Sequence, residues 1–272
     1  MEGQIVKIIS NDYFVKTNNN EYICKARGKF RQENITPKVG DFCLFDEKEK
    51  VIKEIKPRIN TLSRPLVSNI NQAFIVTSLK NPDFSSNLLD KLICICILNN
   101  IKPIICLTKK DLLTKSEYKD LKKIINYYKK LGIKVVYNNN INKIKKLLKH
   151  KTTVFTGQTG AGKSSLMNKL DKSLNFETNE ISKALGRGKH TTRTVSLVEI
   201  NNGKVLDTPG FSDIDLSVYK KEDIRDSFKE FKNKCKYTNC MHINEKECVV
   251  KELVNKNIIL KSRYENYIKF VK

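Results

Sequence analysis

The segment 157–170, GQTGAGKSSLMNKL, constrains the fold of this chain more than any other part of it. Its first eight residues match the pattern G-x-x-x-x-G-K-[ST], the β-branched run TTVFT precedes them, and a helical pattern follows. In that setting the glycines let backbone N–H groups surround phosphates, Lys163 reaches the β and γ oxygens, and the Ser164 hydroxyl binds Mg²⁺. The segment therefore predicts a strand, a phosphate-binding loop and a helix.

A second motif, Asp207-Thr-Pro-Gly210, ends the strand pattern KVLDTPG downstream of this loop. A carboxylate at the end of such a strand can order Mg²⁺ through water, and the N–H of Gly210 can meet a γ-phosphate. The pattern D-x-x-G is weak alone, because many strand-to-turn junctions resemble it. Downstream of a good phosphate loop, it indicates the metal side of the nucleotide site.

A third motif, Thr108-Lys109-Lys110-Asp111, follows the buried strand pattern IIC and precedes the phosphate loop in the chain. The Asp111 carboxylate can accept hydrogen bonds from the N1–H and amino group of guanine, which adenine does not offer, so this motif favours GTP over ATP. The methylene stem of Lys109 would lie along the base. A cluster of charges at a helix N-terminus is the alternative reading of the same residues.

The loop GRGKHTTR at residues 186–193 is rich in glycine, basic residues and threonine. Either Thr191 or Thr192 can close on Mg²⁺, as the switch loops of GTPases do. Phe211 stands where many GTPases carry a glutamine that positions water, so His190 becomes the candidate catalytic group. An ordinary surface histidine is the alternative.

The pattern Cys235-x4-Cys240-x-His242-x5-Cys248 places four soft ligands within fourteen residues. Three thiolates and one imidazole are typical of a closed tetrahedral zinc site that is structural, with no position left for catalysis. Unpaired core cysteines are the alternative. The other five cysteines stand singly in apolar segments and are predicted to be small core residues: Cys24, Cys43, Cys94, Cys96 and Cys106.

The charge balance favours an anionic partner. The chain of 272 residues carries 52 Lys plus Arg against 29 Asp plus Glu, a formal net charge of +23. Such a surplus favours nucleic acid through counterion release, although a composition bias toward lysine would also explain many of these residues. The longest apolar runs fall well short of the roughly 20 residues that cross a bilayer, and the N-terminus lacks a signal-peptide core. We therefore expect a cytoplasmic protein with no membrane partner.

The chain divides into three parts. Residues 3–56 contain five short strand patterns with turn-rich separators, which predicts an N-terminal β-barrel with an OB-fold. Its basic loop, residues 25–31, can bind nucleic acid or simply be exposed. Alternating strand and helix patterns then predict an α/β P-loop domain with a mostly parallel sheet. We expect an OB-fold domain at residues 1–60, a GTPase domain at 61–216, and a helical zinc-binding domain at 217–272.

The order of these features resembles the RsgA (YjeQ/YloQ) family of circularly permuted bacterial GTPases. TKKD comes first, then GQTGAGKS, GRGKHTTR and DTPGF, and then the Cys-Cys-His-Cys finger, all behind a barrel. The segments RGKFR, VGD, LD at Asp90 and RYENYIKF also match the family. The resemblance implies a protein that binds the small ribosomal subunit and its rRNA and acts late in its assembly. It also implies a slow GTPase that the subunit stimulates.

The family's functional residues carry over onto matching positions. The resemblance implies one structural Zn²⁺ at Cys235, Cys240, His242 and Cys248, and hydrolysis aided by His190. Thr108 stands where the family has asparagine, and the usual Ser-Ala near Tyr137 is absent. GTP or GDP, with Mg²⁺, would contact Thr108, Lys109, Lys110, Asp111, Gly157, Gln158, Thr159, Gly160, Ala161, Gly162, Lys163, Ser164, Ser165, Asp207 and Gly210.

The resemblance leaves competing functions open. A ribosome-dependent GTPase acting as a monomer is the main expectation. A GTP-sensing RNA-binding module in which hydrolysis is incidental is the alternative. Asp111 disfavours a third reading, an ATP-dependent nucleic-acid enzyme, while the short side chain of Thr108 keeps it possible.

Overall fold

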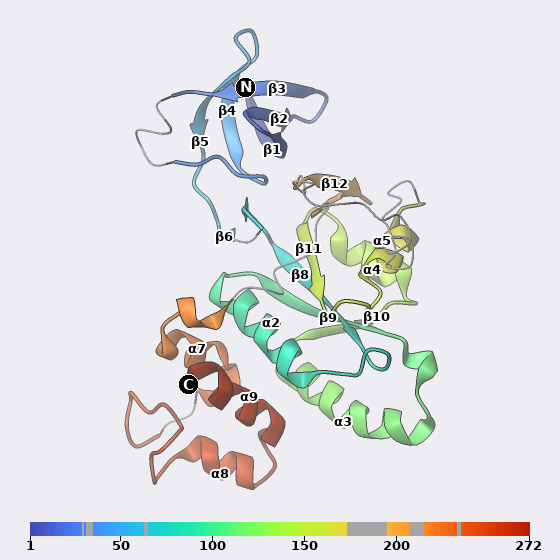
Figure 1. The fold of residues 1–272 in the computed structure, drawn as a ribbon, viewed down its shortest axis with the longest axis vertical. Coiled ribbons are helices and arrows are strands. Elements are labelled where there is room, and N and C mark those ends of the chain that lie inside the picture. Colours follow the sequence, from blue (N-terminus) through green and yellow to red (C-terminus); the bar gives the residue numbers. More distant parts are fainter. Residues whose placement is uncertain (29, 31–34, 63–64, 173–194, 207–214, 233–234) are drawn as a thin grey trace, which may run out of the picture.

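The structure, a computed structural model, describes residues 1–28, 30, 35–62, 65–172, 195–206, 215–232 and 235–272. Figure 1 shows a barrel at one end, a central sheet with helices on both faces, and a helical C-terminal part beside α2. None of the helices in these ranges is both long and apolar enough to cross a membrane.

The N-terminal barrel has the five strands that the sequence predicts. They are β1 (Glu2–Ile9), β2 (Asp12–Lys16), β3 (Glu21–Ala26), β4 (Phe42–Asp46) and β5 (Val51–Ile55), closed in the order β1-β2-β3-β5-β4. Alternate residues point inward, since side chains in a strand alternate between its two faces. Ile5, Val15, Phe45 and the two cysteines Cys24 and Cys43 fill the interior. The predicted barrel and the core position of both cysteines are confirmed.

A partly buried ion pair connects the barrel to the linker that follows it. The Asp41 carboxylate accepts hydrogen bonds from Nε and Nη2 of Arg58, each at 2.7 Å, and from Oγ of Ser68 at 2.5 Å. Gly40 has φ +97°, and a Cβ on it would lie 2.1 Å from the carbonyl oxygen of Ser68. Only glycine fits there, which gives the VGD segment a structural reason. Ser68 belongs to the short ribbon β6 (Thr61–Leu62) and β7 (Val67–Ser68).

The central sheet is mostly parallel, as predicted. Its strands follow the order β10-β9-β8-β11-β13-β12, and only β12 runs antiparallel to its neighbour. The bounds are β8 (Gln72–Ser78), β9 (Lys102–Thr108), β10 (Lys134–Tyr137), β11 (Thr152–Gly157), β12 (Leu197–Ile200) and β13 (Gly203–Leu206). All residues of β8 and β11 are buried. Strands in which every residue is buried are typical of a parallel sheet covered on both faces.

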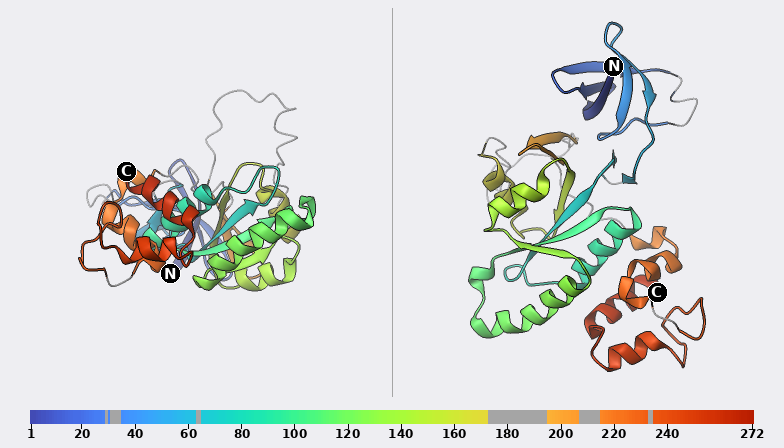
Figure 2. Two further views of the ribbon diagram at one scale, coloured as in Figure 1. Left: turned by 90° about the horizontal axis from the view of Figure 1, so that it is seen from below. Right: turned by 180° about the vertical axis from the view of Figure 1, so that it is seen from behind.

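The sheet separates two helical layers. α2 (Ser86–Leu98) and α3 (Lys115–Lys130) pack on one face, and α4 (Ile141–Leu148) and α5 (Lys163–Leu170) pack on the other. Figure 2 shows the second layer from behind. Cys94 and Cys96 of α2 and Cys106 of β9 are buried, so the core prediction for these three cysteines is also confirmed.

The C-terminal part packs against α2. It contains η3 (Leu216–Val218), α7 (Lys221–Ser227), η4 (Lys229–Phe231), α8 (Val249–Asn255) and α9 (Lys261–Val271). Phe228, Phe231 and Tyr267 form an aromatic cluster with ring centroids 4.9–5.3 Å apart. This cluster belongs to the same apolar core as α2 and α3, so the C-terminal part is an integral layer of the molecule.

A buried charge network crosses this junction. The guanidinium of Arg263 on α9 pairs with Asp90 of α2 and with Glu230 of η4, and all three side chains are almost fully buried. Asp90 also accepts hydrogen bonds from Tyr128 Oη at 2.6 Å and from Asn266 Nδ2 at 2.7 Å. Two segments that the family resemblance singled out, LD and RYENYIKF, therefore meet in one contact.

Candidate functional site

The carboxyl ends of the parallel strands bring the predicted nucleotide motifs together. β9 ends at Thr108 and β11 ends at Gly157, with β8 between them. The hydroxyl of Thr108 donates a hydrogen bond of 2.7 Å to the carbonyl oxygen of Ala161, which is 53 residues away in sequence. Thr108 is only 1% exposed. The base-reading motif and the phosphate loop are thus tied to each other by a buried hydrogen bond.

The phosphate loop has the backbone that its glycines permit. Gly157 has φ +133°, and a Cβ on it would lie 2.1 Å from the carbonyl oxygen of Val76. Gly162 has φ +92° and is the N-cap of α5. Such positions favour glycine, because a side chain would clash or strain the backbone. The first N–H groups of α5 have no partners within the helix, so the loop ends in a site that suits an anion.

Lys163 already occupies the centre of this loop. Its ammonium donates hydrogen bonds to the carbonyl oxygens of Gly157 at 2.8 Å and Gln158 at 2.7 Å. Burial lowers the pKa of this ammonium from its ordinary value. A cation held by neutral carbonyls in a half-buried loop gains when an anion arrives, because a charged acceptor gives stronger hydrogen bonds than a neutral one. The lysine is therefore placed to exchange these carbonyls for phosphate oxygens.

The base-reading motif forms a tight turn after β9. Lys109 has φ +56° and its ammonium donates to the carbonyl oxygen of Asn81. Asp111 lies in the short helix η1 (Lys110–Leu112) and is exposed. Within the part of the chain that the structure describes, its carboxylate has no hydrogen-bond or ion-pair partner. Both acceptor oxygens are therefore available to a ligand.

Sequence reasoning missed the connection between β8 and α2 as a part of this site. Asn81 receives the Lys109 ammonium, and the Cδ of Pro82 lies 3.7 Å from where a Cβ on Gly160 would be. This connection thus touches both nucleotide motifs. Its position could have been expected, since it directly follows a buried parallel strand and ligands bind at the carboxyl ends of such strands.

A pair of tyrosines lies where the family's Ser-Ala is missing. Tyr137 ends β10, and its hydroxyl is 2.9 Å from the hydroxyl of Tyr118 in the first turn of α3. The ammonium of Lys110 lies 4.3 Å from the ring centroid of Tyr118 and 5.3 Å from that of Tyr137. These cation–π contacts fix the third residue of the base-reading motif. Tyr118 was not predicted as part of the site.

Several predicted residues lie outside the described ranges. They are His190, Thr191, Thr192, Asp207 and Gly210. The catalytic and switch-loop predictions therefore stay predictions, as do the Mg²⁺ contacts, including that of Ser164.

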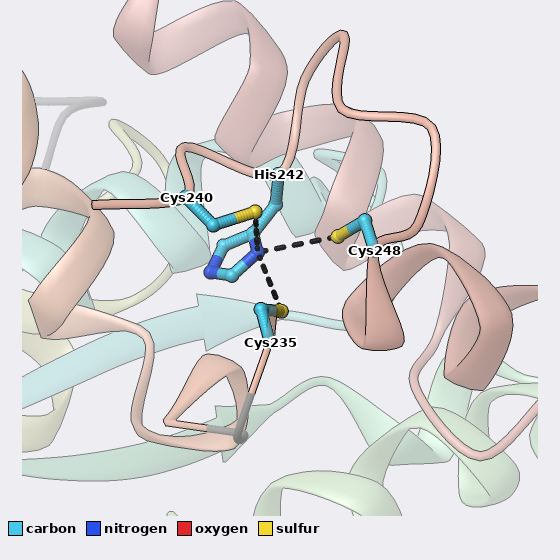
Figure 3. Close-up of side chains that lie close together, drawn as sticks. All are labelled: Cys235, Cys240, His242 and Cys248. Atoms are coloured by element: carbon cyan, nitrogen blue, oxygen red, sulfur yellow. Dashed lines mark hydrogen bonds between the residues drawn. The ribbon is translucent and has the colours of Figure 1, made fainter. Parts of the chain in front are cut away.

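The second predicted site is a compact Cys-Cys-His-Cys cluster, drawn in Figure 3. The ligand atoms of Cys235, Cys240, His242 and Cys248 all lie within 4.8 Å of one another. Nδ1 of His242 is 3.7, 3.3 and 3.3 Å from the sulfurs of Cys235, Cys240 and Cys248. Tetrahedral zinc with Zn–S of about 2.3 Å and Zn–N of about 2.0 Å would separate nitrogen and sulfur by roughly 3.5 Å. The four residues therefore fit a tetrahedral metal ion.

The surrounding backbone supports this cluster. The hydroxyl of Tyr264 donates to the carbonyl oxygen of His242 at 2.7 Å, and Glu245 accepts from the N–H groups of Met241 and Ile243. Burial raises the pKa of the Cys240 thiol to about 12 and lowers the pKa of the His242 imidazole. Metal binding there would therefore release thiol protons. The cluster contacts α9 through Tyr264 and lies apart from the nucleotide motifs.

Two family models match this chain and together span most of it. A model described as RsgA N-terminal domain matches residues 2–51, and one described as RsgA GTPase matches residues 55–217.

Similar proteins cover nearly the whole chain. A protein named small ribosomal subunit biogenesis GTPase RsgA 2, from Oceanobacillus iheyensis, is 44% identical over 99% of this chain and 96% of its own length. RsgA of Clostridium novyi, with the same functional name, is 46% identical with the same coverage. The crystal structure of YloQ, described as a circularly permuted GTPase, superposes with a TM-score of 0.84 at 33% identity over 99% of this chain and 93% of that one. YjeQ from Thermotoga maritima gives a TM-score of 0.85 at 31% identity over 99% and 96%.

Proposed function

Because the chain belongs to the RsgA family of circularly permuted GTPases and is therefore a GTP hydrolase, we propose that it binds the small ribosomal subunit and assists its late maturation. Hydrolysis is slow in the free protein and is stimulated by the subunit. One observation carries this proposal: relatives named for small-subunit biogenesis are 44% and 46% identical over 99% of this chain. The net charge of +23 agrees with an rRNA partner.

GTP and GDP are the proposed nucleotides. Asp111 would accept hydrogen bonds from guanine, and Lys109 would lie along the base. Lys163 would contact the β and γ phosphates, with the backbone N–H groups of residues 157–165 around them. The glycine backbone at Gly157 and Gly162 supports this arrangement, as does the Asp111 carboxylate, which has no partner among the described residues.

Hydrolysis needs a group that aligns water. We assign this role to His190, because Phe211 stands at the position where many GTPases carry glutamine. Ser164, with Thr191 or Thr192, would ligate Mg²⁺, which neutralises charge on the phosphates when bound, and Asp207 and Gly210 would complete the phosphate side. Docking on the ribosomal subunit would raise the rate by gating a reaction already encoded in the chain.

The Cys-Cys-His-Cys cluster is proposed to hold one structural Zn²⁺. The set of three sulfurs and one imidazole nitrogen suits zinc, and the nitrogen-to-sulfur distances of 3.3–3.7 Å support a tetrahedral ion. With all four positions filled by the protein, this ion would stabilise the C-terminal part and take no part in hydrolysis.

We propose an OB-fold domain at residues 1–60, a GTPase domain at 61–216 and a zinc-binding domain at 217–272. The protein would act in the cytoplasm as a monomer, with rRNA of the small subunit as partner and no membrane partner.

A single-turnover GTPase assay, with and without purified small ribosomal subunits, tests the proposal. We expect a slow basal rate and a clear increase with subunits, but no increase with large subunits. A rate that small subunits leave unchanged, in a protein that still binds them in a GTP-dependent way, would instead support a GTP-sensing RNA-binding module.

A further inference from the structure

We propose that the outer side of α4 is an RNA-binding surface of the GTPase part itself, separate from the barrel and the zinc cluster. The surface consists of Lys143, Lys146, Lys149 and Lys151, called here the α4 lysine row. Its ligand is the phosphate backbone of rRNA in the small subunit. This inference rests on the proposed function for the identity of the RNA.

The packing of α4 determines where its lysines lie. Ile144 and Leu148 are fully buried against the sheet, and Asn140 caps the first turn by accepting a hydrogen bond from the Lys143 N–H. The opposite side carries Lys143, Lys146 and Lys149, all exposed. Positions three apart on a helix differ by about 60° around the axis, so these three residues spread over about 120° of the outer side and about 9 Å along the axis.

The chain around α4 carries many lysines and no acidic residue. Residues 121–170 contain twelve lysines and no aspartate or glutamate. No ion pair among the described residues includes Lys143, Lys146, Lys149 or Lys151. On the opposite face of the sheet, α3 carries Asp120, which pairs with Lys123. The α4 lysine row thus keeps its positive charge free of carboxylates in the same stretch of chain.

Helix stability does not explain three of the four lysines in this row. Lysines in the last turn of a helix favour the helix dipole, which accounts for Lys145 and Lys146. Lys143 lies in the first turn, where a positive charge opposes the dipole, and Lys149 and Lys151 lie beyond the last helical residue. A partner outside the helix gives these three positions a common physical reason.

The backbone that carries the row is hydrogen-bonded to the β12–β13 hairpin, which also contacts the barrel. The side-chain amide of Asn201, in the turn between β12 and β13, donates to the carbonyl oxygen of Lys145 at 2.8 Å. The N–H of His150 donates to the carbonyl oxygen of Asn202 at 2.8 Å. The same hairpin contacts the barrel, because Lys204 donates to Gln4 and Lys16 pairs with Glu199 at 3.0 Å. Glu199, the one carboxylate of that hairpin, is thereby neutralised.

The row fits a phosphate backbone better than a lipid surface. A helix that lies on a membrane needs exposed apolar side chains to insert into the lipid. The described residues of α4 and its two flanking turns include no large exposed hydrophobic side chain. Free lysines without apolar neighbours match the non-specific recognition of phosphates, which depends on counterion release. Figure 1 shows α4 on the side of the sheet away from α7, α8 and α9.

The test compares two triple variants of the full chain in binding to purified small ribosomal subunits across a salt series. Lys143→Gln/Lys146→Gln/Lys149→Gln removes three of the four lysines in the row. Lys119→Gln/Lys122→Gln/Lys123→Gln removes the same charge from exposed positions of α3 on the opposite face. If three phosphate contacts are lost, the negative slope of log K against log salt becomes less steep by about 2 to 3. The affinity at 0.1 M salt then falls on the order of 10²-fold. The α3 variant should keep the wild-type slope.

Both variants should retain the basal GTPase rate and thermal stability of the wild type, because the changed side chains are exposed. An α4 variant with the slope and affinity of the wild type would overturn the inference and leave the proposed function intact. An equal loss in both variants would also overturn it, since net charge alone would then explain binding. Failure of the wild type to bind small subunits would remove the proposed function and this inference with it. Binding to anionic vesicles is measured for the same proteins. If the α4 variant loses this binding but binds subunits as the wild type does, the surface binds lipid and the inference is overturned.

Discussion

Replacing Thr108 with valine tests whether one buried hydrogen bond holds the nucleotide site together. Valine has nearly the same shape as threonine, so the packing of this 1% exposed side chain is kept. The change removes the hydroxyl that donates to the carbonyl oxygen of Ala161 at 2.7 Å. Leaving a buried acceptor without a donor costs about 1–3 kcal/mol.

That cost can appear in two measurable places. If the phosphate loop keeps its position, the carbonyl stays buried and the protein loses stability, with Tm lower by roughly 2 to 12 °C. If the loop moves so that water reaches the carbonyl, nucleotide binding weakens by about 5- to 150-fold, because 1.4 kcal/mol corresponds to a factor of ten. Titration with fluorescent GDP and thermal unfolding of the same samples measure both effects.

Two control variants isolate the hydroxyl. Thr108→Ser keeps the donor and removes only a methyl group, so it should retain most of the affinity. Thr156→Val places the same substitution in β11, two strands away in the sheet, where the threonine hydroxyl is buried and has no hydrogen-bond partner among the described residues. It should cost little stability. A Thr108→Val protein that matches the wild type in both Tm and GDP affinity would show that the link between the two motifs does not matter.

Four further outcomes are expected. Asp111→Asn should shift binding from guanosine toward xanthosine nucleotides, because the amide inverts one donor–acceptor relation; equal affinity of the wild type for ATP and GTP would contradict the base assignment. Freshly purified protein should contain one zinc per chain by elemental analysis, and Cys240→Ala should lose it and loosen the C-terminal part. His190→Ala should keep GTP affinity and subunit binding but lose on the order of 10²-fold of the stimulated rate in single-turnover assays. Arg263→Met should destabilise the protein by about 3–5 kcal/mol in urea unfolding, since it leaves the buried Asp90 and Glu230 without their cation; Arg263→Lys, which keeps the charge, should cost less.

The sequence determined those parts of the protein whose chemistry is carried by near neighbours in the chain. A phosphate loop needs glycines, a lysine and a serine within eight residues, and those residues are contiguous from Gly157 to Ser164. The metal cluster spans fourteen residues, from Cys235 to Cys248, and its ligand spacing is itself the signal. The five strands of the barrel and the alternation of the central sheet follow from short-range hydrophobic patterns.

The order of the motifs also came from the sequence, and it was enough to indicate a permuted GTPase. The order of the strands in the central sheet could not be predicted from the sequence. β8 and β11 are neighbours although α2, β9, α3, β10 and α4 separate them in the chain. No local pattern encodes which parallel strands lie side by side, because several orders bury the same apolar residues.

Only the tertiary structure decided the contacts between distant segments. Thr108 and Ala161 are 53 residues apart, and Asp90 and Arg263 are 173 apart. The Tyr118–Tyr137 pair and the contact of Asn81 with Lys109 likewise depend on which strand ends meet. A buried hydroxyl, carboxylate or guanidinium must find its partner in the folded state, and that partner can come from any segment that reaches the same place. The short sequence patterns therefore fixed the chemistry of each motif, whereas packing of the sheet and its helices fixed how the motifs are joined.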